Sequence, residues 1–348
     1  MRSPAHLCLL GIFLVACGIH HDVAAPGDGS SADSAGAGGN QRSESAAGKG
    51  SSVATGRAAT AEVDLNPIQF EMNIDVPAGA ELLKCSYAQL PTDRVTAIGS
   101  AESHYTPGSH HLLVYRSDLT SIPANNQGVW DCQDGSLIIH QRGAYYEAQQ
   151  PDAMRALPDG IAHEFKPGEV IILQSHYINT TEADIAARVE FQLHQVDPAT
   201  VEQEAGTLFF NDPSISVPAH SRASVTMTCP ILDDINPALL WSHMHSRGVH
   251  FVATTDDPAA ADALGTLYES DDWSEPQPRE YPTDPPVVLH AGSHITFSCE
   301  YLNDTDSPFM FGQSAETNEM CILHGMYWPR MSLIGETCLT GVTSRARL

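Results

Sequence analysis

The sequence predicts an all-β protein made of two tandem antiparallel β-sandwich domains of the jelly-roll kind. Several short segments alternate apolar and polar residues with a period of two, as half-buried strands require. Turn-forming residues are frequent, with 23 Pro and 26 Gly, and no long stretch has helical periodicity. The chain of 348 residues is also too long for one sandwich of roughly 100 residues, so two domains are expected.

The alternation is clearest in four segments. They are Ile68 to Val76, Val189 to Leu193, Val225 to Cys229 and Ile295 to Tyr301. Only Pro258 to Tyr268 has the pattern of a short helix. The segment 197–206 is polar and carries a proline, so we place the domain boundary there, with an N-terminal domain at 62–203 and a C-terminal domain at 204–348.

The N-terminus has the pattern of an export signal. After Met1 and Arg2, an apolar run from Leu7 to Ala16 is too short to span a bilayer and matches a signal peptide, at residues 1–17. Cys17 follows with the spacing of a bacterial lipobox, which would make it an acylated anchor; the alternative is a plain signal peptide with an incidental cysteine. Residues 18–61 are mostly Gly, Ala and Ser and are expected to form a flexible, disordered tether.

These features predict an exported, membrane-anchored lipoprotein of the bacterial cell envelope, which meets the membrane only through its lipid. Asp and Glu number 43 against 17 Lys and Arg, and the net charge of -26 repels phosphate backbones, which excludes nucleic acid as a partner. Six cysteines follow the anchor, an even number that indicates disulfides in an oxidising compartment; spacing alone leaves their pairing open.

Candidate metal ligands gather in four short motifs. They are His110-His111, His176, His243-Met244-His245 and Met320-Cys321. His243 and His245 are two residues apart, so on a strand both rings project from one face and can hold one ion. His110 and His111 are adjacent, and shared ligation therefore requires a bend or a bulge, which the preceding Pro107-Gly108 favours. Taken singly, each histidine has the alternative of a structural role.

In this order, the motifs resemble the copper type II ascorbate-dependent monooxygenases, the family of peptidylglycine hydroxylating monooxygenase and dopamine beta-monooxygenase. The resemblance runs over roughly residues 65–340. It implies two copper ions: an electron-supplying copper on the first domain and an oxygen-activating copper on the second. The implied ligands are His110, His111 and His176 for the first, and His243, His245 and Met320 for the second, where they are also the catalytic residues. A thioether is a soft ligand that favours Cu(I).

The resemblance also implies three disulfides. They join Cys85 with Cys132, Cys229 with Cys338, and Cys299 with Cys321. Gln174 lies two residues before His176, on the same strand face, and is a candidate for supporting the copper ligands or the electron path; a structural role is the alternative.

The predicted substrate site departs from that of the peptide-amidating members. Trp241 stands where they have an arginine that binds the peptide carboxylate, and Ile322 and His324 stand where they have Asn and Tyr. An indole has neither the positive charge of an arginine nor the paired N–H groups with which a guanidinium binds a carboxylate. A glycine-extended peptide is therefore not expected as substrate. Trp241 and Ile322 favour an apolar or aromatic substrate, with core packing as the alternative. His324 contacts substrate or metal, or is hydrogen-bonded in the core.

The function predicted by resemblance is that of an oxidoreductase, a copper monooxygenase. It would hydroxylate a C–H bond of a small substrate, with dioxygen and a one-electron donor such as ascorbate as its other partners. The alternative is a non-catalytic copper-binding lipoprotein for storage, delivery or electron transfer, which would bind copper without productive use of dioxygen.

Overall fold

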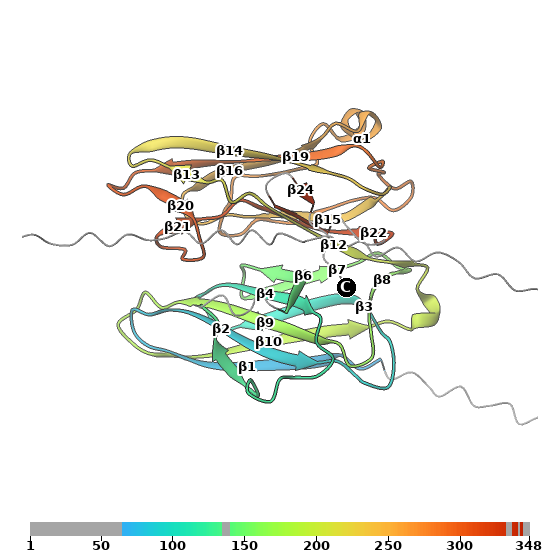
Figure 1. The fold of residues 1–348 in the computed structure, drawn as a ribbon, viewed down its shortest axis with the longest axis horizontal. Coiled ribbons are helices and arrows are strands. Elements are labelled where there is room, and N and C mark those ends of the chain that lie inside the picture. The colour runs from blue at the N-terminus through green and yellow to red at the C-terminus, as the bar shows by residue number, and fades with distance from the viewer. Residues whose placement is uncertain (1–64, 134–139, 332–335, 340–341, 344–348) are drawn as a thin grey trace, which may run out of the picture. The chain divides into compact units, whose positions relative to one another are not determined.

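The computed structural model describes residues 65–133, 140–331, 336–339 and 342–343. Within these residues the secondary structure is almost entirely β, which confirms the predicted fold class (Figure 1). The predicted signal peptide at 1–17, the predicted anchor Cys17 and the predicted tether at 18–61 lie outside the described residues. No described helix is long and apolar enough to cross a membrane.

Residues 68–204 form two sheets. The first has the order β1-β10-β3-β8-β11, with β7 also paired to β3. Its strands are β1 (Ile68–Val76), β3 (Thr96–Tyr105), β7 (Asp152–Ala156), β8 (Ile161–Phe165), β10 (Ile185–Gln195) and β11 (Gln203–Glu204). The second sheet has the order β5-β2-β9-β4-β6. Its strands are β2 (Glu81–Gln89), β4 (Ser109–Ser117), β5 (Val129–Asp131), β6 (Gln141–Ala148) and β9 (Val170–Ile178).

Residues 206–343 form three further sheets. The largest has the order β18-β15-β22-β12-β23-β24, and the others are β14-β19-β16-β17 and β13-β20-β21. The strands of the largest sheet are β12 (Gly206–Asn211), β15 (Asn236–His243), β18 (Arg279–Glu280), β22 (Ile322–Trp328), β23 (Thr337–Leu339) and β24 (Val342–Thr343). Those of the other two are β13 (Ser216–Val217), β14 (Ser221–Pro230), β16 (Gly248–Thr255), β17 (Tyr268–Ser270), β19 (His294–Asn303), β20 (Phe309–Phe311) and β21 (Asn318–Glu319).

The hydrophobic core follows this division of the strands. One cluster of buried residues draws on both sheets of residues 68–204, and another is built almost entirely from residues 205–338. Strands β1 and β19 alternate buried and exposed side chains along most of their length, because each covers a core with one face. The predicted boundary at 203/204 stays a prediction, as does the arrangement of two tandem sandwiches.

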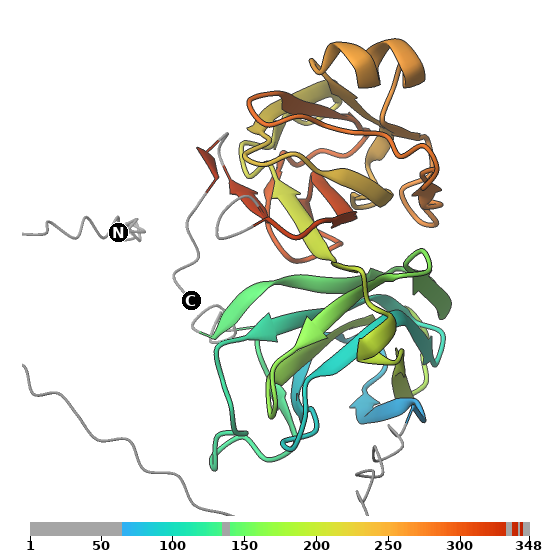
Figure 2. The same cartoon turned by 90° about the vertical axis from the view of Figure 1, so that its right-hand side faces the viewer.

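The α-helix α1 (Pro258–Leu264) is shorter than the sequence predicts. Asp257 caps its first turn by accepting the backbone N–H groups of Ala259 and Ala260. Gly265, with a positive φ of 70°, ends the helix, and Tyr268 already belongs to β17. The helix contacts β16 (Figure 2). The apolar pattern predicted its start correctly, and the glycine set the end three residues before Tyr268.

Candidate metal centre

Five of the predicted ligands lie together in one group. We call His110, His111, His176, His243 and His245 the histidine cluster. Its ring centroids are 4.9 Å apart for His110 and His245, 5.1 Å for His111 and His176, and 5.3 Å for His111 and His243. One ring nitrogen from each of His110, His111 and His243 lies within 4.8 Å of the other two. The structure thus brings ligands predicted for two coppers into one cluster.

A bulge on β4 allows two adjacent histidines to reach this cluster. The pairing of β4 with β9 shifts register between Ser109 and His111, and His111 then lies opposite His176. Ser109 closes the bulge, since its hydroxyl donates to the backbone carbonyls of both His111 and His176, each at 3.1 Å. The rings of His110 and His111 are therefore only 5.0 Å apart instead of pointing to opposite faces.

The second pair of histidines comes from the end of β15. His243 is the last residue of the strand, and His245 lies just beyond it, in a turn where Gly248 N–H donates to the His245 carbonyl at 3.0 Å. Position 248 must be glycine because an added Cβ would lie 2.8 Å from the buried Met244 side chain. The two rings have centroids 5.4 Å apart, so the His-x-His spacing does place both on one side of the chain.

Three cluster histidines have one ring nitrogen beside an oxygen. His176 Nε2 lies 2.8 Å from Glu81 Oε1, and His245 Nδ1 lies 3.0 Å from the Asn318 carbonyl oxygen. His243 Nδ1 lies 3.3 Å from Glu147 Oε1. The hydrogen bonds of His176 and His245 favour a proton on the bonded nitrogen and leave the opposite nitrogen as a lone-pair donor, which is how metal-binding histidines are commonly oriented. The contact of His243 is longer and is not a hydrogen bond.

All five cluster histidines have ring nitrogens that are buried without hydrogen-bond partners. They are His110 Nε2, both nitrogens of His111 and of His243, His176 Nδ1 and His245 Nε2. Burial lowers the pKa of His245 to about 3 and moves the pKa of His110 and His111 far below the ordinary value, with repulsion from the neighbouring rings adding to it. These three rings are neutral at neutral pH. A group of buried imidazoles with unpaired nitrogens fits a borderline metal ion such as copper.

Met320 lies on a segment that is tied to the cluster. Its carbonyl accepts the Tyr301 hydroxyl at 2.8 Å, and the next residue is held by the Cys299–Cys321 disulfide. On its other side, buried Glu319 accepts the backbone N–H groups of His245 at 3.1 Å and Arg247 at 2.9 Å. The structure thus fixes the backbone around Met320, whose side chain is half-buried.

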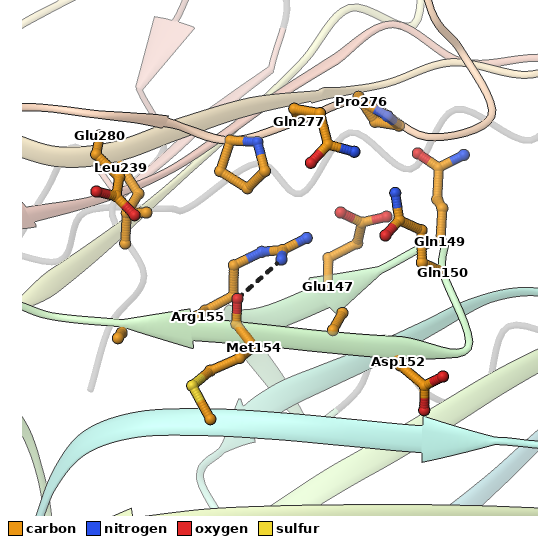
Figure 3. Close-up of a pocket in the computed structure, with 13 residues that line it drawn as sticks. Glu147, Gln149, Gln150, Asp152, Met154, Arg155, Leu239, Pro276, Gln277 and Glu280 are labelled. Carbon is orange, nitrogen blue, oxygen red and sulfur yellow. Dashed lines mark hydrogen bonds between the residues drawn. The ribbon is translucent and has the colours of Figure 1, made fainter.

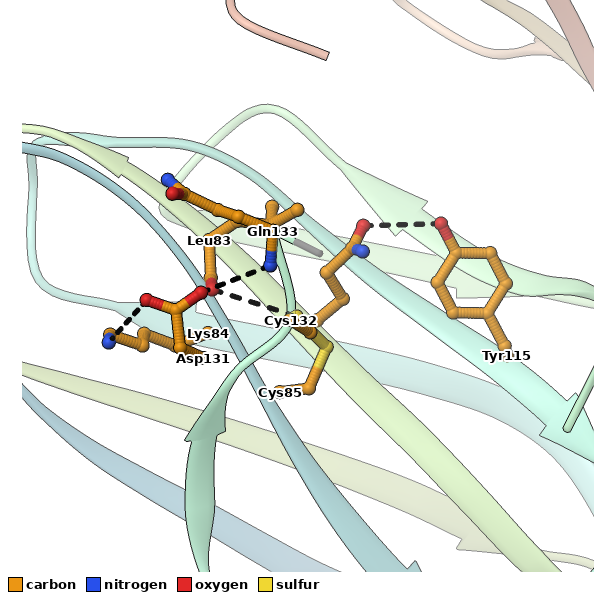
Figure 4. The surroundings of a disulfide bond; sticks show 8 residues. Leu83, Lys84, Cys85, Tyr115, Asp131, Cys132 and Gln133 are labelled. Atoms are coloured by element: carbon orange, nitrogen blue, oxygen red, sulfur yellow. Dashed lines mark hydrogen bonds and ion pairs between the residues drawn. A yellow bond between two sulfur atoms is a disulfide. The ribbon is translucent and has the colours of Figure 1, made fainter. Parts of the chain in front are cut away.

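The structure contains the disulfide pairs that the resemblance implies. Besides Cys299–Cys321, these are Cys85–Cys132 and Cys229–Cys338. The first of them lies beside β9, near Tyr115, whose hydroxyl donates to Gln174 Oε1 at 3.2 Å (Figure 4). Gln174 therefore supports the strand that carries His176, and its oxygen contacts a tyrosine.

The three candidate substrate residues are buried. Trp241 and His324 stack with centroids 5.4 Å apart and an interplanar angle of 5°, and Ile322 pairs with His243 across β22 and β15. They are 2%, 3% and 3% exposed, respectively, which favours the packing alternative for Trp241 and Ile322. His324 also contacts Phe209, and its Nε2 is buried without a partner.

Sequence reasoning missed the carboxylates around the cluster. Glu81 accepts from His176, from the Ser314 hydroxyl at 2.8 Å and from Ala315 N–H at 3.1 Å. These bonds lower its pKa to about 2, the His176 bond most strongly. Glu147 has no motif around it and lies 96 residues before its partner His243. Neither pairing has a local signal, because each depends on strands that meet only in the fold.

A cavity of about 410 Å³ is lined in part by Glu147, and no cluster histidine belongs to its lining (Figure 3). The lining mixes polar and apolar residues, and its polar members include Gln149, Arg155 and Gln277. The Arg155 guanidinium lies 5.1 Å from the ring centre of Trp241 and is almost fully buried. A single buried side chain, Glu147, thus contacts both the cavity and a cluster histidine.

Together, the fold and the cluster describe a β-sheet protein with a group of imidazoles that could hold a metal ion. Residues 204–346 match a family model, the copper type II ascorbate-dependent monooxygenase, C-terminal domain. The match confirms the predicted resemblance for this part of the chain, and the copper in the family's name fits imidazole ligands.

Comparison of folds adds no functional information. The major capsid protein P2 from bacteriophage PM2 aligns over 76% of this chain and 98% of its own, with 8% identity and a TM-score of 0.34. PBCV-1 VP54, fitted into a reconstruction of the virophage Sputnik, covers 82% and 98% with 7% identity and a TM-score of 0.25. Both scores are too low to carry an argument. No curated protein sequence gave a match.

Proposed function

We propose that the protein is a copper-dependent monooxygenase, which hydroxylates a C–H bond of a small substrate with dioxygen and a one-electron donor such as ascorbate. The observation that carries the proposal is the histidine cluster, whose inward ring nitrogens are buried and unpaired. Burying a polar group without a partner is costly, and one or more bound metal ions would satisfy these nitrogens at once. The family match at residues 204–346 supports copper over other metals.

The proposed ligands are His110, His111 and His176 for one copper, and His243, His245 and Met320 for the other. Copper, when bound, supplies one-electron transfer and the activation of dioxygen. The chain's own residues hold the ligands: Glu81 orients His176, and the Asn318 carbonyl orients His245. The bulge on β4 already directs His110 and His111 into the cluster, and the end of β15 with its following turn does so for His243 and His245.

The cavity beside Glu147 is the proposed place for substrate. It borders Glu147, which contacts His243. Its polar lining residues, among them Gln149, Arg155 and Gln277, would orient a small substrate that carries polar groups.

We also propose that the protein works outside the cytoplasm, anchored through Cys17. The three disulfides support an oxidising compartment. Metabolic labelling with a fatty acid analogue tests the anchor, and Cys17→Ala should abolish the label.

The enzymatic proposal is tested with isotopically labelled dioxygen. Copper-loaded full-length protein, given ascorbate and a panel of small polar substrates, should consume dioxygen and place one labelled oxygen atom in a product. His243→Ala should stop both. Tight copper binding without any labelled product would favour a copper-binding protein instead.

A further inference from the structure

Glu147 is a carboxylate enclosed between the two groups of strands. It lies on β6, is 1% exposed, and contacts residues of β15. Its Oε2 accepts the Trp241 indole N–H at 2.6 Å, and its Oε1 lies 3.3 Å from His243 Nδ1. Both atoms are buried and have no hydrogen-bond partner among the described residues, so their 3.3 Å approach is a close contact and not a formed hydrogen bond. A buried carboxylate requires such partners, because leaving it unpaired is very costly.

The two oxygens of Glu147 face different groups: Oε2 faces the Trp241 indole, and Oε1 faces His243 Nδ1. An indole N–H can only donate a hydrogen bond, and a carboxylate oxygen accepts one. Oε2 is therefore committed to Trp241, and Oε1 requires a proton on the nitrogen that faces it.

We propose that Glu147 is the positioning residue of His243, which it holds in the tautomer with a proton on Nδ1 and a free lone pair on Nε2. His243 Nε2 is buried without a partner, as a metal-binding nitrogen must be before the ion arrives. A histidine of the C-terminal strands is thus prepared for metal by a residue of the N-terminal strands. Copper as the metal rests on the proposed function, whereas the inferred tautomer of His243 does not.

Substitution by glutamine gives a specific prediction. In Glu147→Gln the Trp241 N–H still requires an acceptor, so the new carbonyl oxygen must stay on that side. The amide NH₂ then faces His243 Nδ1 and favours the opposite tautomer, with its proton on Nε2, which blocks the metal-binding nitrogen. Removing the indole N–H as well, in Glu147→Gln/Trp241→Phe, frees the amide to turn its oxygen toward His243.

The experiment combines a metal-free and a metal-loaded readout on the full chain. Nitrogen NMR of ¹⁵N-histidine protein, with His243 assigned by its loss in His243→Ala, reports the tautomer without metal. Competition with a chelator reports copper affinity. We expect Nδ1–H in the wild type and in Trp241→Phe, Nε2–H in Glu147→Gln with affinity lowered about 10- to 100-fold, and recovery of Nδ1–H and of part of the affinity in the double variant.

Asp271→Asn is the matched control, because exposed Asp271 pairs with Nδ1 of half-buried His250 at 2.7 Å outside the cluster, and it should leave copper affinity unchanged. The proposal is overturned if Glu147→Gln keeps the Nδ1–H tautomer with wild-type affinity. The loss of copper affinity that Trp241→Phe causes alone is first subtracted from the loss in the double variant. The proposal is also overturned if the remaining loss is as large as the loss in Glu147→Gln. A protein that binds no copper contradicts the proposed function, but the metal-free NMR result still decides the role of Glu147.

Discussion

Replacing Cys299 and Cys321 together by alanine is expected to lower both the free energy of unfolding and the affinity for copper. The disulfide joins residues 22 positions apart, and both cysteines are fully buried. The loss of loop-closure entropy predicts a destabilisation of about 3 kcal/mol for a loop of this length. The truncated side chains add a small cavity to that cost.

The same bond holds the residue next to Met320. Without it, the segment keeps the hydrogen bond from Tyr301 to the Met320 carbonyl and the bonds from Glu319 to the backbone of His245 and Arg247. The segment is therefore expected to loosen without detaching. Copper affinity at the His243, His245 and Met320 site should fall about tenfold, in the range found when residues that support metal ligands are removed.

The assay is urea unfolding of the metal-free protein together with copper competition against a chelator. Cys229→Ala/Cys338→Ala is the control, because that disulfide closes a sequence separation of 109 and is expected to cost more stability, about 5 kcal/mol, with no change in copper affinity. Equal loss of copper affinity in both variants would refute the reasoning. The loss would then result from a general destabilisation of the fold and not from the release of the segment next to Met320. An unchanged unfolding free energy in Cys299→Ala/Cys321→Ala would refute it as well.

Three further perturbations follow from the site. Glu81→Ala should cost about 2 kcal/mol of stability, measured by urea unfolding, because it removes the acceptor of a cluster histidine and of two loop groups. Burial lowers the pKa of His163, His245 and His324 to about 3, 3 and 4. Between pH 6.5, the ordinary pKa of histidine, and about pH 4, only the unfolded chain takes up protons on these histidines. The free energy of unfolding of the metal-free protein should therefore be highest above pH 6.5 and fall by roughly 1 kcal/mol per pH unit for each histidine as the pH drops toward 4. Urea unfolding at successive pH values should show a smaller slope for His163→Asn. Copper at a hundredfold excess over its dissociation constant should raise the unfolding free energy by about 3 kcal/mol, and no rise in a thermal melt would contradict binding to the folded state.

Local pattern was enough to predict several strands and to single out the histidines that the fold brings together. Alternation identified β1 and β19, and the His-x-His spacing placed His243 and His245 on one side of the chain, although His245 lies just past the strand. The adjacent His110 and His111 required an irregularity, and the bulge on β4 supplies it. These features are determined by residues that are close together in the chain, so the sequence alone can indicate them.

The residues that hold the ligands could not be predicted, because they come from distant strands. Glu81 reaches His176 from β2, and Glu147 reaches β15 from β6. Nothing in the sequence indicated that ligands predicted for two coppers would lie in one cluster. Periodicity predicts individual strands and contains no information about which strands lie next to one another. The same limit applies to Trp241, whose burial against His324 depends on the pairing of β15 with β22.

The copper content of purified full-length protein tests the central claim most directly, measured for the wild type and for His110→Ala, His243→Ala and the exposed control His220→Ala. The account predicts two coppers in the wild type and the control, and one in each cluster variant. A wild-type protein that binds no copper, or cluster variants that keep the full content, would contradict it.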